Sequence, residues 1–413
     1  MFSRLNRHIK RMVVRQQRSR PIIRISDTTL RDGCQTPGVR LGPEQKAEIA
    51  AALAATGIHS IDCGFPAAGE FEMAGVRAIT RRVKGPVFSV HARTKREDIE
   101  RAAEALEGVS PLKRAVTLFI GISRIHREYK HEMSKAQVID AVVKSAEYAS
   151  SMFELISFGP EDASRTEPEF LHEVYRNAIS AGCLSVGYTD TVGFQTPDKV
   201  HDTIRRIQDE VPNIGDALMG VHFHNDLGLA TANALAAVKA GVHMVQGTIN
   251  GIGERAGNTA IEEVVLALHL HRDEFRRSCT VDLGALCALS KLVAERTGFR
   301  PAANKAVIGE NLFRSETGVH QDGMMKHPET YMPFPPDLIG AKPVAYLLGP
   351  NSGRKAVRQE LESRGLDATD EHVEQVLEYL KSGKFNDAEH VEVDAFLERM
   401  RPHLAKEDSR RLA

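Results

Sequence analysis

The chain is 413 residues long, has a formal net charge of −1 and is 42% hydrophobic. This length predicts one large domain with a smaller appendage, and the hydrophobic share is sufficient for a core. The near-zero charge argues against a global field that would recruit nucleic acid or an anionic membrane, so neither is an expected partner. No apolar run approaches the roughly 18 residues needed to cross a bilayer.

The first twenty residues are rich in arginine and contain no acid. We interpret them as a frayed basic extension, or as the product of an upstream start codon with Met12 nearer the true beginning. The alternative is a mitochondrial transit peptide, which is also Arg-rich and acid-poor. Five scattered cysteines without CxxC spacing indicate a reducing compartment, so we expect a cytoplasmic protein unless residues 1–20 are such a peptide.

Eight short apolar or β-branched runs follow one another from residue 22 onward, separated by Ala-, Glu- and Lys-rich segments with helical spacing. The predicted strands cover residues 22–29, 60–65, 87–92, 115–122, 153–158, 184–189, 218–224 and 244–250, and predicted helices cover 43–55, 96–106, 135–150, 167–181, 197–210 and 230–240. This alternation predicts a (β/α)8 TIM barrel over residues 21–275. A doubly wound sheet is the alternative, but the first turn lacks the Gly-rich phosphate loop typical of that fold.

Beyond about residue 275 the pattern changes to helices without strands. A helix is predicted over 282–297, then a Gly- and His-rich connector over 309–331, and further helices at 352–363, 370–382 and 387–400. We therefore expect residues 276–413 to form a mostly helical linker and accessory region.

A TIM barrel carries its chemistry at the C-terminal ends of its strands. Polar side chains close or follow the eight predicted strands: Arg31 and Asp32, Asp62, His91, Ser123 and His126, Glu161, Thr191, His222 and His224, and Glu254 to Asn258. Any one of them could be a surface or capping residue. Together they predict one polar site at the C-terminal end of the barrel, which we call the mouth.

His222 and His224 form the most informative pair, because side chains two apart on a strand share one face. Both imidazoles can therefore reach one divalent cation. Asp32, after the first strand, adds a carboxylate. Two imidazoles and a carboxylate suit zinc, manganese or magnesium, with positions left open for a substrate.

Three motifs carry a family resemblance: DTTLRDG at 27–33, HFHNDLGLA at 222–230 and NGIGERAGN at 250–258. Further matches are GFPAA at 64–68, PEDASRT at 160–166, DTVG at 190–193 and GVHQDG at 318–323. Over roughly residues 22–360 the chain resembles the acetyl-CoA-dependent 2-alkylmalate synthases, which include 2-isopropylmalate synthase and homocitrate synthase. The resemblance implies a Claisen-type condensation of acetyl-CoA with a 2-oxo acid.

The resemblance also implies roles for particular residues of these three motifs. Asp32, His222 and His224 would hold the divalent metal, and Asn258 would complete its shell. The metal would polarise the keto group of the 2-oxo acid. Arg31 would stabilise the negative charge that develops on the same oxygen.

Other roles implied by the family concern the proton that acetyl-CoA must lose. In the family, removal of this proton is assigned to the glutamate that corresponds to Glu161 and to a His/Tyr pair after the barrel, which corresponds here to His320 and Tyr331. The pair would reach the site of a neighbouring subunit, so a homodimer is expected. Thr191 would position the substrate carboxylate.

The choice of 2-oxo acid is left open by conflicting signals. The segment 123–130, with Ser123 and His126, is similar to isopropylmalate synthases, which take a branched apolar 2-oxo acid. His91 resembles homocitrate synthases that bind a second carboxylate, yet Ser157 stands where some of these carry an arginine. We expect 2-isopropylmalate synthase activity, with homocitrate synthase, or a synthase for a phosphono or phosphino 2-oxo acid, as the alternative.

Two departures from the family pattern alter the mouth: Cys34 and Asp62 both stand where glutamates are common. An acyl-CoA lyase or aldolase on the same barrel, and a catalytically idle barrel, are further alternatives. The 320–331 segment and the NGIGERAGN motif favour the synthase. Leucine-pathway synthases usually carry a C-terminal regulatory domain, and we expect none here, hence no leucine feedback through one.

Overall fold

The computed structural model describes residues 2–382. The chain divides into two compact units, Met1–Pro301 and Ala302–Ala413. The first unit extends past the change of pattern at residue 275, because α11 (Leu286–Thr297) packs against α2 (Pro43–Ala55) of the barrel. A bidentate ion pair between Arg296 and Glu48, at 2.7 and 2.8 Å, joins these two helices.

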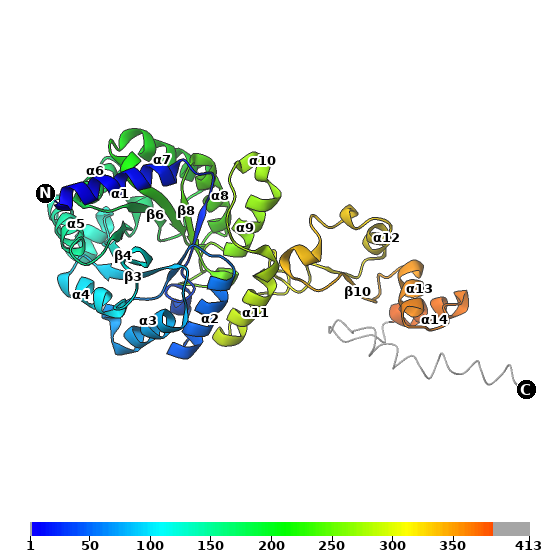
Figure 1. Ribbon diagram of the computed structural model, residues 1–413. Coiled ribbons are helices and arrows are strands. Elements are labelled where there is room, and N and C mark those ends of the chain that lie inside the picture. Colours follow the sequence, from blue (N-terminus) through cyan, green and yellow to red (C-terminus); the bar gives the residue numbers. More distant parts are fainter. Residues whose placement is uncertain (1, 383–413) are drawn as a thin grey trace, which may run out of the picture. The chain divides into compact units, whose positions relative to one another are not determined.

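Eight parallel strands close into a barrel in the order β1 to β8, and helices surround it (Figure 1). The strands are β1 (Arg24–Asp27), β2 (Ser60–Asp62), β3 (Val87–Arg93), β4 (Arg114–Phe119), β5 (Leu155–Phe158), β6 (Ser185–Asp190), β7 (Leu218–Phe223) and β8 (Met244–Gly247). Each pairs with its neighbours in parallel, and β1 pairs with β8 to close the ring. The predicted TIM barrel is confirmed.

The outer helices of the barrel alternate with its strands. Besides α2 they are α3 (Glu70–Arg82), α4 (Arg96–Ala105), α5 (Lys135–Ala149), α6 (Pro168–Ala181), α7 (Pro197–Glu210), α8 (Ala230–Ala240), α9 (Ile261–Leu270) and the short α10 (Arg272–Phe275). Proline opens α2, α6 and α7, where its fixed φ suits the first helical turn. The predictions for α2, α7 and α8 are confirmed to the residue. The predicted helices did not include α3 or α9, and in α9 a nearly continuous apolar stretch hides the helical spacing.

Register places the candidate residues His91 and Ser157 in one layer that runs across four strands, β3 to β6. His91 pairs with Thr117, Thr117 with Ser157, and Ser157 with Ser185. The residues that alternate with them, such as Val90, are fully buried and apolar. Because successive side chains of a strand point to opposite faces, these apolar residues face the helices and the polar layer faces the barrel interior.

The basic N-terminal segment forms helix α1 (Phe2–Arg18), which lies beside α6 and α7 (Figure 1). Its arginines have partners at the N-terminal end of β7: Arg15 Nε donates to Asp216 Oδ1 at 2.9 Å, and Arg18 donates to two backbone carbonyls. Val14 is buried on the same side. The expectation of a frayed extension is therefore wrong for residues 2–18, because acceptors distant in sequence hold the helix.

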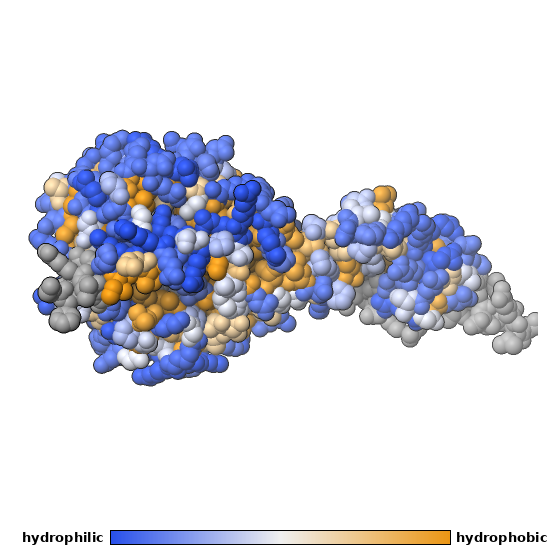
Figure 2. Space-filling view, turned by 45° about the horizontal axis from the view of Figure 1, so that its top comes forward, coloured by the Kyte–Doolittle hydropathy of each residue, from blue (hydrophilic) through white to orange (hydrophobic). Residues whose placement is uncertain are grey.

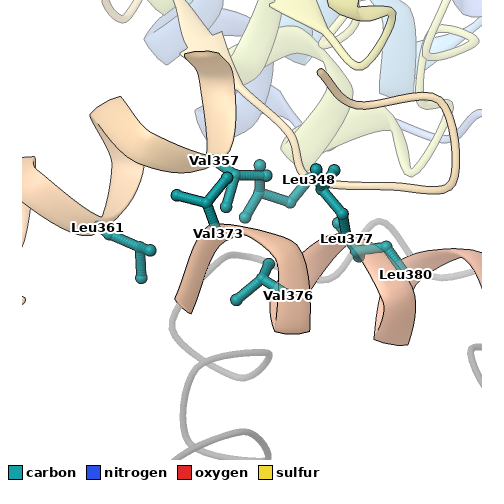
Figure 3. Packing of buried hydrophobic residues seen from close by; sticks show 7 residues of the cluster. All are labelled: Leu348, Val357, Leu361, Val373, Val376, Leu377 and Leu380. Carbon is teal, nitrogen blue, oxygen red and sulfur yellow. The ribbon is translucent and has the colours of Figure 1, made fainter. Parts of the chain in front are cut away.

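The second unit has a small core of its own, drawn in Figure 3. Leucine and valine side chains from α13 (Arg354–Ser363) and α14 (Asp370–Lys381) interlock there with Leu348. Two features were not predicted: a parallel pair of two-residue strands, β9 (Arg314–Ser315) and β10 (Ala345–Tyr346), and helix α12 (Gly318–Lys326) inside the Gly-rich connector. The helix predicted over 387–400 lies outside the described residues.

The surface of the barrel unit that faces the viewer in Figure 2 is mostly hydrophilic, with hydrophobic side chains in separate patches. In the part of the chain that the structure describes, no helix is both long and apolar enough to span a membrane. All five cysteines are free thiols.

Candidate active site

Three buried side chains meet at the C-terminal end of the barrel, where a metal site was predicted. Asp32 lies on the turn after β1, His222 is in β7, and His224 follows it. The two Nε2 atoms are 3.2 Å apart, and Asp32 Oδ2 lies 3.8 and 4.0 Å from them. One ligand atom from each residue falls within 4.8 Å of the others, a grouping that can hold one metal ion.

The charge state of this cluster suits a divalent cation. Burial, reinforced by the neighbouring His224, lowers the pKa of His222 to about 3, so the ring is in the neutral form that binds metals. Burial alone would raise the pKa of Asp32, but the charge of Arg31, together with the hydrogen bond from Asn258, holds that pKa well below its usual range. One carboxylate and two neutral imidazoles are a donor set that fits zinc, manganese or magnesium.

Asn258 supports this cluster through Asp32. Its Nδ2 donates to Asp32 Oδ1 at 2.8 Å and to the Ile252 carbonyl at 3.1 Å. Its Oδ1 is buried and has no hydrogen-bond partner among residues 2–382, which leaves one oxygen donor beside the cluster. Gly253 makes the approach possible, because a Cβ there would lie 2.0 Å from Asn258 Nδ2 and 2.8 Å from Asp32 Oδ1.

Asp62 is the centre of a second buried network, and prediction missed this role. Its Oδ2 accepts hydrogen bonds from Arg31 Nε at 2.6 Å and Thr28 Oγ1 at 3.0 Å, and His91 Nε2 lies 3.1 Å away. Arg31 Nη1 also donates to Asp32 Oδ2 at 3.1 Å. Arg31 is thus fixed between the two carboxylates. The sequence signal was the acid at the end of the second strand.

An apolar wall lies beside this network. The His91 ring packs against Phe119, with centroids 5.7 Å apart, and Phe119 packs edge-on against Phe65 at 5.9 Å. Ser157, in the same interior layer as His91, has its hydroxyl 2.5 Å from that of Ser185. The hydroxyls of Ser157 and Ser185 and the Nε2 atom of His91 therefore already have partners within the chain, whereas Asp62 Oδ1 is buried without a hydrogen-bond partner among residues 2–382.

The loops after β4 and β5 bring three more predicted residues together. Ser123 Oγ accepts a hydrogen bond from the His126 backbone at 3.2 Å, and His126 Nδ1 lies 3.9 Å from Glu161 Oε2. Lys130 Nζ contacts both carboxylate oxygens of Glu161 at 2.7 Å. His126 and Lys130 lie in one π-helical turn (His126–His131), a rare element often found at functional sites and without a sequence signature here.

Thr191 directly follows β6 and contacts the loops after β5 and β8. Its Oγ1 accepts a hydrogen bond from the Asp162 backbone at 2.9 Å, and its carbonyl accepts one from Arg255 Nη2 at 2.6 Å. Arg255 in turn forms a bidentate pair with Asp226, at 2.8 and 2.9 Å. Thr191 is therefore held at the mouth by the Asp162 backbone after β5 and by Arg255 after β8, and Asp226 after β7 fixes Arg255.

His320 and Tyr331 lie in the second unit and are brought together there. Their rings stack with centroids 4.1 Å apart and an interplanar angle of 31°. Gly323 leaves room for this pair, since a Cβ at that position would lie 2.7 Å from the tyrosine ring. The eleven-residue spacing thus brings the two rings into contact, while their action on a neighbouring subunit stays a prediction.

Comparison with known proteins agrees with this geometry. A family model described as HMGL-like matches residues 22–293, and one described as homocitrate synthase post-HMGL domain-like matches residues 307–387. The chain is 42% identical over 357 residues to 2-isopropylmalate synthase of Pyrococcus abyssi, covering 86% of this chain and 73% of that protein. It is 40% identical over 379 residues to 2-isopropylmalate synthase of Halothermothrix orenii, covering 91% and 73%.

Solved structures share the barrel at low sequence identity. An HMG-CoA lyase of Bacillus subtilis is 20% identical, with a TM-score of 0.60 over 70% of this chain and 97% of that one. The carboxyl transferase domain of Rhizobium etli pyruvate carboxylase is 15% identical, with a TM-score of 0.56 over 71% and 52%. These likenesses show the fold, and the matches to the family models and the synthases confirm the resemblance predicted from the motifs. The chain therefore belongs to the HMGL-like family and, within it, to the group of the 2-isopropylmalate synthases.

Proposed function

We propose that this chain catalyses the Claisen-type condensation of acetyl-CoA with 2-oxoisovalerate, a branched apolar 2-oxo acid, to give 2-isopropylmalate and CoA. The reaction would serve amino-acid biosynthesis. The observation that carries the proposal is the position of Arg31, fixed against Asp32 beside His222 and His224. This arrangement places the guanidinium of Arg31, held in a fixed position, beside a set of possible metal donors at the mouth of the barrel. The relatives' names support the same activity.

The first half of the chemistry is activation of the keto group. A divalent cation held by Asp32, His222 and His224, with Asn258 beside them, would supply Lewis-acid polarisation of that group. Arg31 would donate to the oxygen on which negative charge develops. Although burial lowers the pKa of Arg31, Asp62 and Asp32 outweigh this effect and raise it, so the guanidinium stays charged. A preoriented charge of this kind stabilises a transition state without reorganisation.

The second half is formation of a carbon nucleophile from acetyl-CoA. A C–H bond of the acetyl methyl group breaks and its proton passes to a base. The new C–C bond forms at the keto carbon as the C=O π bond breaks, and the oxygen that receives this electron pair takes up a proton to become the product hydroxyl. We assign the proton transfer to Glu161, oriented by Lys130, together with the stacked His320 and Tyr331 pair of a neighbouring subunit in a homodimer. Water then hydrolyses the thioester and releases CoA.

The environment of His91 supports a branched apolar substrate. Its Nε2 lies 3.1 Å from Asp62, so a second substrate carboxylate would meet that negative charge as well as the imidazole. Phe119 and Phe65 extend the wall as apolar surface. Thr191, at the end of β6, would orient the carboxylate common to all 2-oxo acids. An anionic 2-oxo acid remains the second candidate, because His91 itself is a donor that an apolar substrate does not need.

The experiment that tests the substrate is a panel of 2-oxo acids incubated with acetyl-CoA and Mn²⁺, with CoA release and product mass measured together. The panel contains 2-oxoisovalerate, 2-oxoglutarate, pyruvate, phenylpyruvate and phosphonopyruvate. We expect the highest kcat/KM with 2-oxoisovalerate and a product with the mass of 2-isopropylmalate. A preference for 2-oxoglutarate or phosphonopyruvate would assign the anionic alternative, and turnover with none of the panel would contradict the proposed reaction.

A further inference from the structure

A cleft of about 710 Å³ lies at the end of the barrel opposite the mouth. It opens between α1, the second half of α7 and the residues that precede β7 and β8. Its lining includes four arginines and one acid, Asp216. The chain as a whole is close to neutral, so this is a local concentration of positive charge.

Two of the four arginines have structural partners. Arg15 pairs with Asp216 at 2.7 Å, and the same carboxylate lies 3.6 Å from Arg11, so the acid is already engaged. Arg18 donates to the carbonyls of Ile214 and Ala217, at 3.0 and 2.6 Å. These contacts attach α1 to the barrel and account for both side chains.

The side chains of Arg205 and Arg277 have no structural partners of this kind. Neither guanidinium group has a hydrogen-bond or ion-pair partner within residues 2–382, and Arg277 Nη1 is buried without an acceptor. Burial lowers the pKa of Arg277, and burial together with the nearby Arg277 lowers that of Arg18. A guanidinium that is partly removed from water and faces another cation is destabilised unless an anion offsets its charge.

Neutral groups of the cleft add further donors. Gln208 Nε2 is buried without an acceptor. His243 Nδ1 accepts a hydrogen bond from the Met219 backbone at 3.2 Å, and burial lowers the pKa of His243 to about 3. The neutral ring must then carry its proton on Nε2, which makes that atom a donor. One acceptor, Asn213 Oδ1, also lacks a partner in this part of the chain and can pair with a hydroxyl.

We propose that this cleft binds a small phosphate-bearing anion. Guanidinium groups match phosphate oxygens in a bidentate manner, and the cleft has the volume of a small-molecule site. The P–OH group of hydrogen phosphate also offers the donor that Asn213 Oδ1 needs, which favours phosphate over sulfate. The site is distinct from the mouth, because its residues lie at the N-terminal ends of the strands and the metal cluster lies at the other end.

The test is isothermal titration of the full-length protein with inorganic phosphate, pyrophosphate, ADP and sulfate. Arg205→Gln and Arg277→Gln each remove one charge from the cleft. Arg206→Gln is the matched control, because this neighbour on α7 pairs instead with Glu210 at 2.7 Å and Glu169 at 3.3 Å. We expect pyrophosphate to bind the wild type and the control equally, and roughly tenfold or more weakly to the two cleft variants.

The comparison among phosphate compounds identifies the source of the anion. Tighter binding of ADP than of pyrophosphate assigns a nucleoside phosphate, and the reverse order assigns a free phosphate. Equal affinity in all four proteins would place the anion elsewhere and overturn the proposal, as would no binding of any phosphate compound. Because Arg205 is exposed, Arg205→Gln keeps the test decisive even where Arg277→Gln lowers the thermal unfolding midpoint. CoA release should be unchanged in both variants.

Discussion

Arg31 Nε lies 2.6 Å from Asp62 Oδ2, and this buried ion pair joins the ends of β1 and β2. The same guanidinium contacts Asp32, so Asp62 determines where the charge of Arg31 sits relative to the metal donors. Asp62 itself lies outside the grouping of Asp32, His222 and His224. We therefore regard Asp62 as a positioning residue for Arg31.

Substitution Asp62→Asn is expected to lower kcat roughly a hundredfold, since Arg31 would lose its charged anchor and a transition-state donor would be misplaced. Steady-state kinetics with a parallel Mn²⁺ titration measures the effect. The metal affinity should stay near that of the wild type, and Asp62→Glu, which keeps the charge, should recover part of kcat. An unchanged kcat in Asp62→Asn, or a loss of metal binding that matches the loss of rate, would contradict the positioning role.

Substitution Gly253→Ala is expected to weaken Mn²⁺ binding by at least tenfold while the barrel stays folded. Its Cβ would lie 2.0 Å from Asn258 Nδ2, so the support of Asp32 would have to move. Gly108→Ala is the matched control, because Gly108 also has a positive φ, +78°, but open space around its Cβ position. The control should show only the cost of a side chain at positive φ, about 1–2 kcal/mol of stability. Equal metal affinity in both variants would sink this prediction.

Mixing two inactive variants tests whether His320 and Tyr331 act across a homodimer. Asp32→Ala removes a metal donor and His320→Ala removes the proposed proton-transfer partner. If the pair acts on the neighbouring subunit, each heterodimer has one intact site, and equal mixing after subunit exchange should restore about a quarter of wild-type activity. No recovery, with heterodimers demonstrated by mass spectrometry, would show that each subunit uses its own pair.

Asp27 gives the stability of the protein a defined pH dependence. Burial outweighs its hydrogen bonds with Thr29 and raises the pKa of this carboxyl from 3.8 to about 7. Between these pH values the folded protein holds a proton that the unfolded chain lacks, so this contribution to stability is complete below pH 3.8 and is lost as pH rises through 7. Asn is neutral throughout, so Asp27→Asn should gain stability relative to the wild type over this window in urea unfolding. A stability difference that does not vary with pH would refute this.

The barrel and the meeting of His222 with His224 could be predicted because both depend on local pattern. Alternation of strand and helix sets the fold, and the two-residue spacing of His222 and His224 sets their common face. The role of Asp62 could not be predicted in this way. Its partner Arg31 is 31 positions away in the sequence, and the two side chains meet only when the barrel closes. Helix α1 was missed for the same reason: Arg15 meets Asp216 across 201 positions.

The central claim is that Asp32, His222 and His224 form the metal centre of an acetyl-CoA-dependent 2-oxo acid synthase. The most direct measurement is the initial rate of CoA release from acetyl-CoA and 2-oxoisovalerate, in the wild type and in Asp32→Ala, at saturating Mn²⁺. We predict a rate that requires both substrates, falls to background with EDTA, and is absent in Asp32→Ala. A wild-type rate in Asp32→Ala, or a rate unaffected by EDTA, would contradict the account.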